Sequence, residues 1–275
     1  MRIGLVGLGR MGAAMAGRLA AQGLDVVGFD SDSGRGGVDQ LEAVAAPTVV
    51  LSLPNEGAVA GVLDRLLPAL PRGAVVADTS TLSPIAARQF ASRAEAAGCL
   101  YLDAPVSGGP AGAAAGTLTV MAGGEAAALD AANPVLTRLA ARILHVGGPG
   151  AGQVAKLVNN LLVATHLVVA GEALRIGTAA GVPAEALLSV INSASGRSAV
   201  TEVNLPRWIL SGSFDSGFSA GLMRKDVRLA LELAEAVGAD PETCARAAQA
   251  WNAAEVGDGD DFNRVTALLM GRARA

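Results

Sequence analysis

Residues 3–19 read IGLVGLGRMGAAMAGRL, and this stretch decides the fold of the first half of the chain. The apolar run up to Leu8 predicts a buried strand, and the alanine-rich run after Gly12 predicts a helix. Gly7, Gly9 and Gly12 lie between them at the spacing of a dinucleotide-binding loop. In such a loop the first glycine permits a tight turn, the second lets the backbone approach a pyrophosphate, and the third allows helix–strand packing. A simple glycine-rich turn is the alternative, which the order of strand, loop and helix disfavours.

Asp30 ends the next β-rich run, LDVVGFD at 24–30, and lies 18 residues after Gly12. An acidic side chain at this point hydrogen-bonds the ribose 2′-hydroxyl of NAD and repels the 2′-phosphate of NADP. The sequence therefore favours NAD as the cofactor. Two observations keep alternatives open. Asp30 also begins DSDSG, which is a good turn sequence, and Arg35 is near enough in sequence to meet the phosphate of NADP.

Short β-rich runs alternate with alanine-rich helical segments up to about residue 150. This pattern predicts an α/β domain with a mainly parallel, doubly wound sheet, and the continuous apolar strands indicate that both of its faces are covered. After residue 150 apolar residues recur at three- and four-residue spacing, which predicts helices. We therefore expect a dinucleotide-binding domain at 1–150 and an all-helical substrate and oligomerisation domain at 151–275. The predicted strands cover 2–8, 24–30, 47–54, 73–80, 100–106, 118–124 and 142–148, and the predicted helices cover 12–22, 56–70, 83–98, 151–181, 183–195, 221–238 and 241–257.

The composition excludes several classes of protein. The chain has 275 residues, a net charge of −4 and only 3% aromatic residues, so nothing indicates a nucleic-acid partner. Cys99 and Cys244 lie far apart and show no metal-ligand spacing with His145 or His166, so we expect no metal site. The N-terminus reads as a strand rather than a signal peptide, and the apolar run at 161–171 is too short to cross a bilayer. These features predict a soluble cytoplasmic protein without a membrane partner.

A second glycine motif, SGG at 107–109, follows the predicted strand at 100–106. Ligands bind at this end of the strands in open α/β sheets. The hydroxyl group of Ser107 and the N–H groups of Gly108 and Gly109 suit a carboxylate, which accepts several hydrogen bonds. An ordinary Ser-Gly-Gly turn has the same sequence, so this motif alone does not define a site.

Four blocks of sequence, in order, resemble the β-hydroxyacid dehydrogenase family, whose members include 3-hydroxyisobutyrate dehydrogenase and tartronate semialdehyde reductase. The blocks are 3–19, 103–124, 147–162 and 217–234, and SASGRS at 193–198 and GDGDDFNRV at 257–265 also match. The resemblance implies a Rossmann domain joined by a long helix to a helical domain. It also implies an NAD(P)-dependent oxidoreductase that interconverts a small 3-hydroxy acid, such as 3-hydroxyisobutyrate, and its semialdehyde. One departure is that 31–46 is too short for the helix and strand that the family usually has there, so we expect a sheet shortened on the adenine side.

By this resemblance Lys156 is the family's catalytic lysine and Asn160 is its amide partner. The chemistry needs such a lysine, because hydride transfer to an aldehyde generates an alkoxide, and a lysine ammonium within hydrogen-bond reach can protonate it. A free lysine has a pKa of about 10.4, so catalysis at neutral pH favours a partly buried amine. Residues four apart share a helix face, whereas Asn159 points about 100° away from Asn160. The alternative is a solvated lysine, which the apolar surroundings in sequence disfavour.

The resemblance assigns further residues. Ser107 joins Lys156 and Asn160 in the catalytic set, and Ser107, Gly108, Gly109 and Asn160 would hold the substrate, with Phe218 and Asp226 bordering the site. The cofactor would contact Gly7, Leu8, Gly9, Arg10, Met11, Gly12, Asp30, Leu53, Pro54, Thr81 and Lys225. The alternatives are a surface ion pair for Lys225 with Asp226 and a core position for Phe218.

Two other functions stay open at this point. Imine reductases share the scaffold, but relatives of that kind usually lack a lysine at the position of Lys156. A catalytically silent nucleotide-binding module would fit the shortened segment 31–46, but it would not need Ser107, Lys156 and Asn160. The apolar helices after residue 150, together with the resemblance, predict a homodimer or homotetramer.

Overall fold

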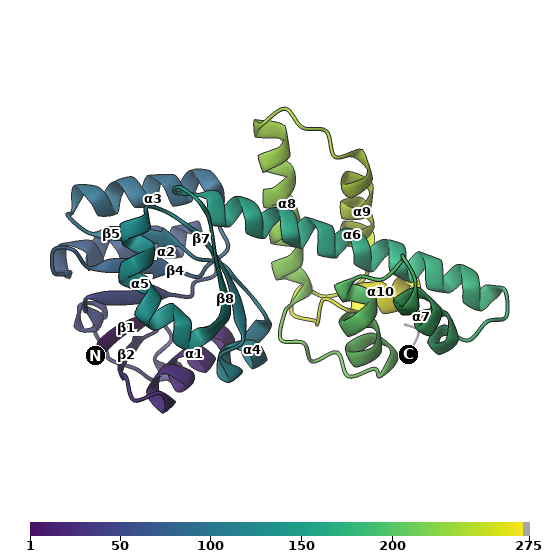
Figure 1. The fold of residues 1–275 in the computed structure, drawn as a ribbon, viewed down its shortest axis with the longest axis horizontal. Helices are drawn as coiled ribbons and strands as arrows, with labels where there is room; N and C mark the ends of the chain where they lie inside the picture. Colours follow the sequence, from purple (N-terminus) through teal and green to yellow (C-terminus); the bar gives the residue numbers. More distant parts are fainter. Residues whose placement is uncertain (272–275) are drawn as a thin grey trace. The chain divides into compact units, whose positions relative to one another are not determined.

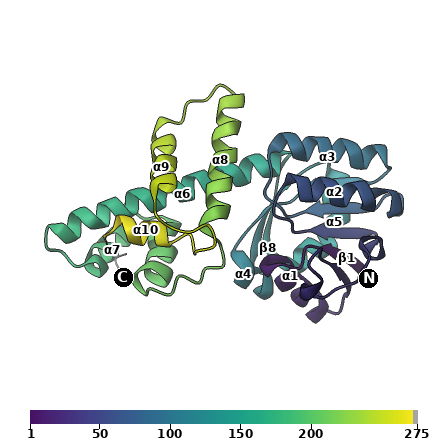
Figure 2. The same ribbon diagram turned by 180° about the vertical axis from the view of Figure 1, so that it is seen from behind.

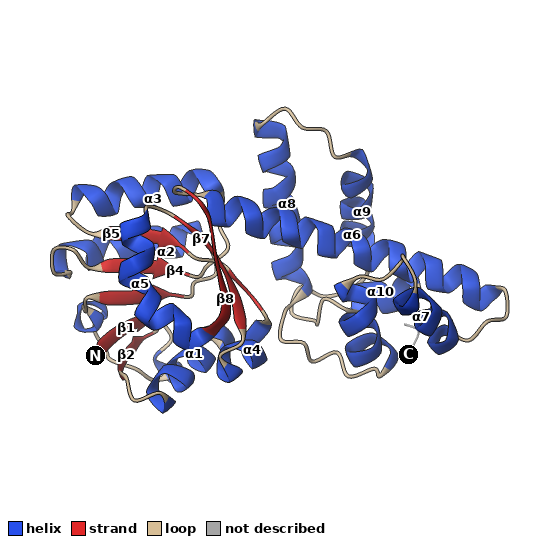
Figure 3. Cartoon of the chain, in the orientation of Figure 1, coloured by secondary structure: helices blue, strands red, loops and turns tan. Residues whose placement is uncertain are grey.

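The structure is a computed structural model and describes residues 1–271. The chain forms two compact units, Met1–Lys156 and Leu157–Ala275. Within the described residues every named strand lies in the first unit, and the second unit is built from helices and loops (Figure 3). The predicted combination of an α/β sheet domain and a helical domain is therefore confirmed.

The first unit is built on an eight-stranded sheet in which five strands run parallel in the order β2-β1-β3-β4-β5. The remaining three lie beyond β5: β7 is antiparallel to β5, β6 is antiparallel to β7, and β8 is parallel to β7. Strand order reverses between β1 and β3, and ligands of such sheets bind at the carboxyl ends of the strands at this reversal. The strands are β1 (Arg2–Val6), β2 (Asp25–Phe29), β3 (Thr48–Leu51), β4 (Val75–Asp78), β5 (Leu100–Asp103), β6 (Val106–Ser107), β7 (Leu118–Gly123) and β8 (Ala140–Gly147).

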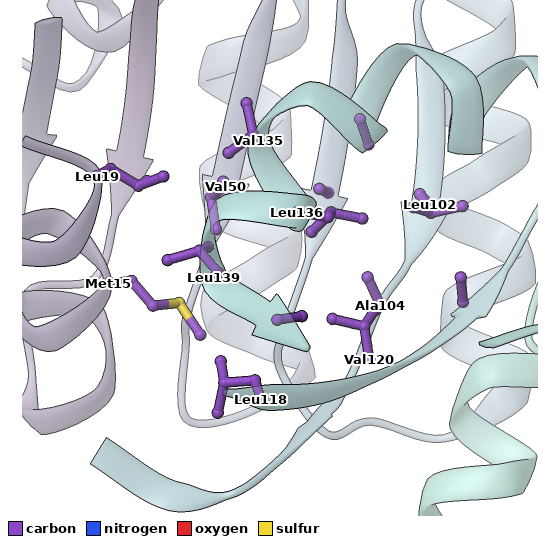
Figure 4. Packing of buried hydrophobic residues seen from close by; sticks show 14 of the residues in the cluster. Met15, Leu19, Val50, Leu102, Ala104, Leu118, Val120, Val135, Leu136 and Leu139 are labelled. Atoms are coloured by element: carbon purple, nitrogen blue, oxygen red, sulfur yellow. The ribbon is translucent and has the colours of Figure 1, made fainter. Parts of the chain in front are cut away.

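Helices cover both faces of the sheet, as the apolar strands predict. Figure 1 shows α1 and α5 on one face, and Figure 2 shows α2 and α3 on the other. Successive residues of a strand point to opposite faces, so Val50 of β3 packs with α1 and α5 (Figure 4) whereas Val49 and Leu51 pack with α2 and α3. The helices are α1 (Arg10–Ala21), α2 (Glu56–Leu66), the short 3₁₀ helix η3 (Leu67–Ala69), α3 (Pro84–Ala96), α4 (Gly109–Ala115) and α5 (Ala126–Leu139).

The segment between β2 and β3 is as short as the sequence indicates. It holds two 3₁₀ helices, η1 (Ser33–Arg35) and η2 (Leu41–Val44), and no strand. β2 is therefore the last strand on its side of the sheet. The N–H group of Val38 donates to the carbonyl oxygen of Gly28 at 2.8 Å, so part of this segment lies along the open side of β2.

Three features of the first unit differ from the sequence prediction. The strand predicted at 100–106 ends at Asp103, and β6 is a separate short strand that pairs with β7. Pro105 explains the break, because proline has no N–H group to continue the ladder. The other two differences are α4 and α5, neither of which the sequence pattern predicts; α5 contains Pro134.

The second unit surrounds its own apolar core. Its helices are α6 (Ala151–Ala179), which begins in the first unit, α7 (Ala184–Ser193), the π-helix η4 (Val200–Leu210), α8 (Ala220–Ala236), α9 (Glu242–Ala253) and α10 (Arg264–Leu269). Trp251 is fully buried in this core with Leu205 and Val265, and its indole N–H donates to the carbonyl oxygen of Ala164 at 3.0 Å. The sequence pattern does not predict η4, whose interior holds Pro206, or the short α10.

Among the described helices, α6 alone has the length and apolar composition that a bilayer-spanning helix needs, and 44% of its most apolar window is buried within the protein. The buried side includes Ala164, Leu167 and Leu174, which belong to the core of the second unit. Packing in a core explains the apolar residues on this side of α6.

Candidate functional site

The glycine loop after β1 has the geometry that its sequence predicts. Gly7 has a φ of +94°, and a Cβ atom on it would lie 2.2 Å from the carbonyl oxygen of Ser52. A Cβ atom on Gly12 would lie 1.7 Å from the carbonyl oxygen of Gly7, so α1 approaches the turn too closely for any side chain. At Gly9 a Cβ atom would meet only the Arg35 guanidinium, at 3.4 Å. Two glycines thus close the turn, and the middle one leaves room above it.

The donors at the start of α1 fit a pyrophosphate. No side chain caps this helix, and its first turn contains no acidic residue. The first N–H groups of a helix have no partner within it and carry partial positive charge, which suits an anion. Arg10 is exposed at the first position of the helix, and Leu8 and Met11 are half-buried beside it. The residues present therefore match the diphosphate part of a dinucleotide.

Asp30 lies directly after β2 with its side chain only 7% exposed. Its Oδ2 accepts from the N–H group of Leu8 at 2.7 Å and lies 3.4 Å from an Arg35 guanidinium nitrogen, and its Oδ1 accepts from the N–H group of Asp32 at 2.9 Å. Burial alone would raise the pKa of Asp30, but these N–H groups and Arg35 outweigh it and lower the pKa. The carboxylate therefore stays charged beside the glycine loop.

A hollow of about 160 Å³ adjoins Asp30. Besides Asp30 its lining comes from the end of β2 and the short segment that follows, with Phe29, Ser31, Ser33, Gly36, Gly37, Val38 and Asp39. Arg35 also pairs with Asp32, at 3.2 Å. The shortened segment thus makes a small polar hollow with more acidic than basic groups around it.

The other predicted cofactor contacts of the first unit follow β3 and β4. Leu53 and Pro54 come directly after β3, and Thr81 comes after β4. The N–H group of Leu53 donates to the hydroxyl oxygen of Ser80 at 2.9 Å, which joins the two loops. Because β1, β3 and β4 are parallel, these residues share one edge of the sheet with the glycine loop.

Ser107, Gly108 and Gly109 lie at a strand-to-helix junction. Ser107 is half-buried at the end of β6, and Gly108, with a φ of +127°, precedes α4. No side chain caps α4. A hydroxyl group and uncapped N–H groups are therefore adjacent, and this donor set suits a carboxylate.

Lys156 is buried, with 7% of its surface exposed. It lies in the second turn of α6, so the alternative of a solvated surface lysine is wrong. Asn160 follows one turn later on the same helix and is 5% exposed. A buried amine and a buried amide therefore lie one turn apart on the same helix.

In the second unit, Asn160 contacts Asp226. The amide nitrogen of Asn160 donates to Asp226 Oδ2 at 2.7 Å, and its amide oxygen accepts from Asn159 at 3.1 Å. Asp226 is 1% exposed, and its Oδ1 makes no hydrogen bond but lies 3.2 Å from Lys225 Nζ. The Lys225–Asp226 pair is therefore not a surface pair, and it fixes the orientation of Asn160.

Phe218 is not brought into this cluster by any contact of its ring. It packs edge-to-face on Phe262, with the ring centroids 5.4 Å apart, and belongs to the margin of the apolar core. This ring contact fits the packing role given as its alternative, and Phe218 is half-buried.

Several buried polar residues at the same edge of the first unit escaped the sequence analysis. Asp78, Asp103 and Gln153 are each 0% exposed. Tyr101 donates to Asp78 Oδ2 at 2.7 Å. Burial raises the pKa of Asp103 to about 6, although the N–H groups of Gly150 and Gln153 oppose the shift. The one local sequence feature that points to these residues is Gln153 itself, a polar residue three positions before Lys156 in an apolar helix. Within residues 1–271 no cluster of three or more His, Cys, Asp or Glu side chains is arranged to hold a metal ion.

Comparison with known proteins gives two family matches that together span nearly the whole chain. Residues 2–147 match the NAD binding domain of 6-phosphogluconate dehydrogenase. Residues 150–269 match the domain described as NAD-binding of NADP-dependent 3-hydroxyisobutyrate dehydrogenase.

Individual relatives agree. The chain is 39% identical over 246 residues to 2-(hydroxymethyl)glutarate dehydrogenase of Eubacterium barkeri, covering 84% of this chain and 82% of the relative. It is 40% identical over 258 residues to the NAD-dependent L-serine dehydrogenase of Pseudomonas aeruginosa, covering 86% of each. A structure of Mycobacterium tuberculosis 3-hydroxyisobutyrate dehydrogenase with L-serine superposes with a TM-score of 0.89 at 36% identity, over 98% of this chain and 99% of that one. With its glycine loop, Asp30 and buried Lys156, the chain belongs to the β-hydroxyacid dehydrogenase family and is an NAD(P)-dependent hydroxyacid dehydrogenase.

Proposed function

We propose that this enzyme oxidises the hydroxymethyl group of a small 3-hydroxy acid to the semialdehyde, and that 3-hydroxyisobutyrate is its preferred substrate. The observation that carries the proposal is the buried Lys156 with Asn160 one turn away. The substrates named for the relatives support it, because 3-hydroxyisobutyrate, L-serine and 2-(hydroxymethyl)glutarate all carry a hydroxymethyl group on the carbon next to a carboxylate.

The third substituent on that carbon separates the three substrates. It is a methyl group in 3-hydroxyisobutyrate, an ammonium in L-serine and a second carboxylate arm in 2-(hydroxymethyl)glutarate. Binding a charged substituent in a dry site calls for a partner of opposite charge. Asp226, the acid among the residues proposed to border the substrate, is already engaged by Lys225 and Asn160. A neutral methyl group needs no such partner, which favours 3-hydroxyisobutyrate.

Each side chain then has one task. The chemistry that a bound nicotinamide would supply is uptake of a hydride from the carbon that bears the hydroxyl group. Lys156, as the neutral amine, accepts the hydroxyl proton during oxidation, and as the ammonium it returns the proton during reduction. Asn160, held by Asp226, donates its remaining amide hydrogen to the reacting oxygen. Ser107 and the N–H groups of Gly108 and Gly109 hold the carboxylate and so fix the hydroxymethyl group in place.

In this proposal the cofactor contacts belong mainly to residues 1–150, which also supply Ser107, Gly108 and Gly109 to the substrate. Residues 151–275 supply Lys156, Asn160 and the subunit contacts. The glycine loop binds the pyrophosphate, Asp30 binds the adenosine ribose, and Leu53, Pro54 and Thr81 line the path to the nicotinamide.

A panel assay tests the proposed function. Purified protein is mixed with NAD and, separately, with 3-hydroxyisobutyrate, L-serine or 2-(hydroxymethyl)glutarate, and the absorbance of NADH is followed. We expect the highest kcat/KM with 3-hydroxyisobutyrate. Binding of NAD without turnover of any hydroxy acid would support a silent nucleotide-binding module, and reduction of cyclic imines alone would support an imine reductase.

We propose further that Asp30 makes NAD the preferred cofactor. Asp30→Ser removes the charge that repels a 2′-phosphate and releases Arg35 from its pairing with Asp30. We expect the ratio of kcat/KM for NAD to that for NADP to fall at least about tenfold, which corresponds to roughly 1.4 kcal/mol. Asp25→Ser is the matched control, because Asp25 begins the same strand at its opposite end. A preference that is equal in wild type and Asp30→Ser would contradict this role.

We also infer that the enzyme is a homo-oligomer. Val158, Leu162, Val169 and Ile176 are 56%, 50%, 45% and 72% exposed, and their spacing of four, seven and seven places them on one face of α6. An apolar stripe of this kind on a helix indicates a protein interface. Val169→Asp combined with Ile176→Asp should lower the mass measured by light scattering, whereas Val237→Asp, at an isolated exposed valine, should not. A wild-type protein of single-chain mass would refute the inference.

A further inference from the structure

A buried glutamine attaches the first turn of α6 to the loop after β4. Gln153 Oε1 accepts from the N–H group of Leu82 at 3.0 Å, and Gln153 Nε2 donates to the carbonyl oxygen of Ser80 at 2.9 Å. Gln153 is 0% exposed. The two bonded residues flank Thr81, so the side chain of Gln153 grips the backbone on both sides of that residue.

Asp103 holds the same turn of α6 from the neighbouring strand β5. Its Oδ1 accepts from the N–H group of Gly150 at 2.8 Å, and its Oδ2 accepts from the N–H group of Gln153 at 3.0 Å. N–H groups at a helix start lack partners within the helix, and a buried carboxylate here satisfies two of them. Hydrogen bonds thus join the first turn of α6 to the loop after β4 and to the end of β5. They fix the position of this turn along the helix axis and its rotation about that axis.

Neither the Gln153 side chain nor the Asp103 carboxylate takes part in the chemistry proposed above. A core needs no glutamine for packing, because an apolar side chain of similar length fills the same space without any risk of unpaired polar atoms. Lys156 follows Gln153 by three residues and so lies on the adjacent part of the same helix face. Any rotation of this turn moves the amine of Lys156 relative to Thr81.

We propose that Gln153 is a positioning residue for the hydride-transfer reaction. By bonding Ser80 and Leu82 it fixes the distance between Lys156 and the loop that carries Thr81, and Asp103 serves as the anchor for the same turn. The inference rests on the proposed function, since Gln153 acts only through Lys156. Misplacement of a reacting group by about 1 Å can reduce a rate roughly 10²-fold. Loss of this one pair of hydrogen bonds is therefore expected to slow the reaction strongly.

A double-mutant cycle with Gln153→Met and Lys156→Ala tests the proposal. Methionine has a length similar to that of glutamine but cannot make either hydrogen bond. We expect Gln153→Met to lower kcat roughly 10- to 100-fold while the Kd for NAD changes less than about twofold. In the Lys156→Ala background the same substitution should produce no further loss. Thr165→Val is the matched control, because Thr165 is a buried polar residue of α6 whose hydroxyl bonds only within the helix.

The outcomes separate the two proposals. A Gln153→Met enzyme with wild-type kcat, or an equal loss of kcat in both backgrounds, overturns the positioning role. Wild-type turnover by Lys156→Ala alone overturns the proposed function instead. If Gln153→Met does not fold, Gln153→Glu replaces it, since glutamate keeps the acceptor for Leu82 but sets an oxygen against the carbonyl of Ser80. We expect that variant to lose kcat in the wild-type background and not in the Lys156→Ala background.

Discussion

Lys156→Ala should lower kcat for 3-hydroxy acid oxidation roughly 10²–10⁴-fold, the usual contribution of a general acid or base. Because the amine is buried, a base dissolved in the solvent could replace it only by entering an apolar segment of α6. The Kd for NAD should stay within about threefold of the wild-type value, because the lysine acts on the proton of the substrate rather than on the cofactor. Stopped-flow measurement of NADH formation, with the Kd for NAD from isothermal titration calorimetry, checks both expectations.

Lys156→Arg provides the sharper comparison. Arginine keeps the positive charge and the hydrogen-bond donors but does not release its proton in proteins. If Lys156 transfers a proton, Lys156→Arg should be nearly as slow in oxidation as Lys156→Ala. A rate close to that of wild type would show that charge alone is needed, and Lys156→Ala within threefold of wild type would remove the lysine from the mechanism.

Gly12→Ala should abolish measurable NAD binding. The added Cβ atom would lie 1.7 Å from the carbonyl oxygen of Gly7, so either α1 must move away from β1 or the turn after β1 must open. Both movements displace the N–H groups that face the pyrophosphate. We expect the Kd for NAD to rise more than about 100-fold, equivalent to roughly 2.7 kcal/mol, and the melting temperature to fall as well, because this contact involves backbone atoms that cannot rotate aside.

Gly17→Ala in the same helix is the control. A Cβ atom on Gly17 would meet nothing within 4 Å. Since alanine has the higher helix propensity, this variant should bind NAD normally and be as stable as wild type or more so, by up to about 1 kcal/mol. Normal NAD binding by Gly12→Ala, measured by isothermal titration calorimetry, would show that the loop does not hold the cofactor as we describe.

The sequence predicts most of the first unit because its strands are apolar and its glycine loop has a fixed spacing. It fails where packing overrides local preference. In α5, Pro134 interrupts the helical pattern, yet Val135, Leu136 and Leu139 continue the helix because they are buried against the sheet. Proline in a helix interior destabilises an isolated helix by about 3 kcal/mol. The local sequence therefore predicts that the helix ends at this point. Pro206 in η4 hides a helix in the same way.

The candidate site shows the same division. The spacing of four residues between Lys156 and Asn160 predicts that they share a helix face. In the structure both belong to α6. The partners of that face are distant in sequence: Gln153 bonds Ser80, 73 residues away, and Asn160 bonds Asp226, 66 residues away. No periodic pattern in the local sequence predicts contacts between residues so far apart in the chain. Asp103, Gln153 and the role of Asp226 therefore become visible only in three dimensions.

The position of β2 at the end of the sheet has a consequence for solubility. Strand edges with unpaired N–H and C=O groups invite a strand from another molecule to add to them, and natural proteins block this. Here the short segment between β2 and β3 covers part of this edge, because the Val38 N–H group donates to the carbonyl oxygen of Gly28. Further trimming of that segment would therefore expose this strand edge to pairing with other molecules and to aggregation.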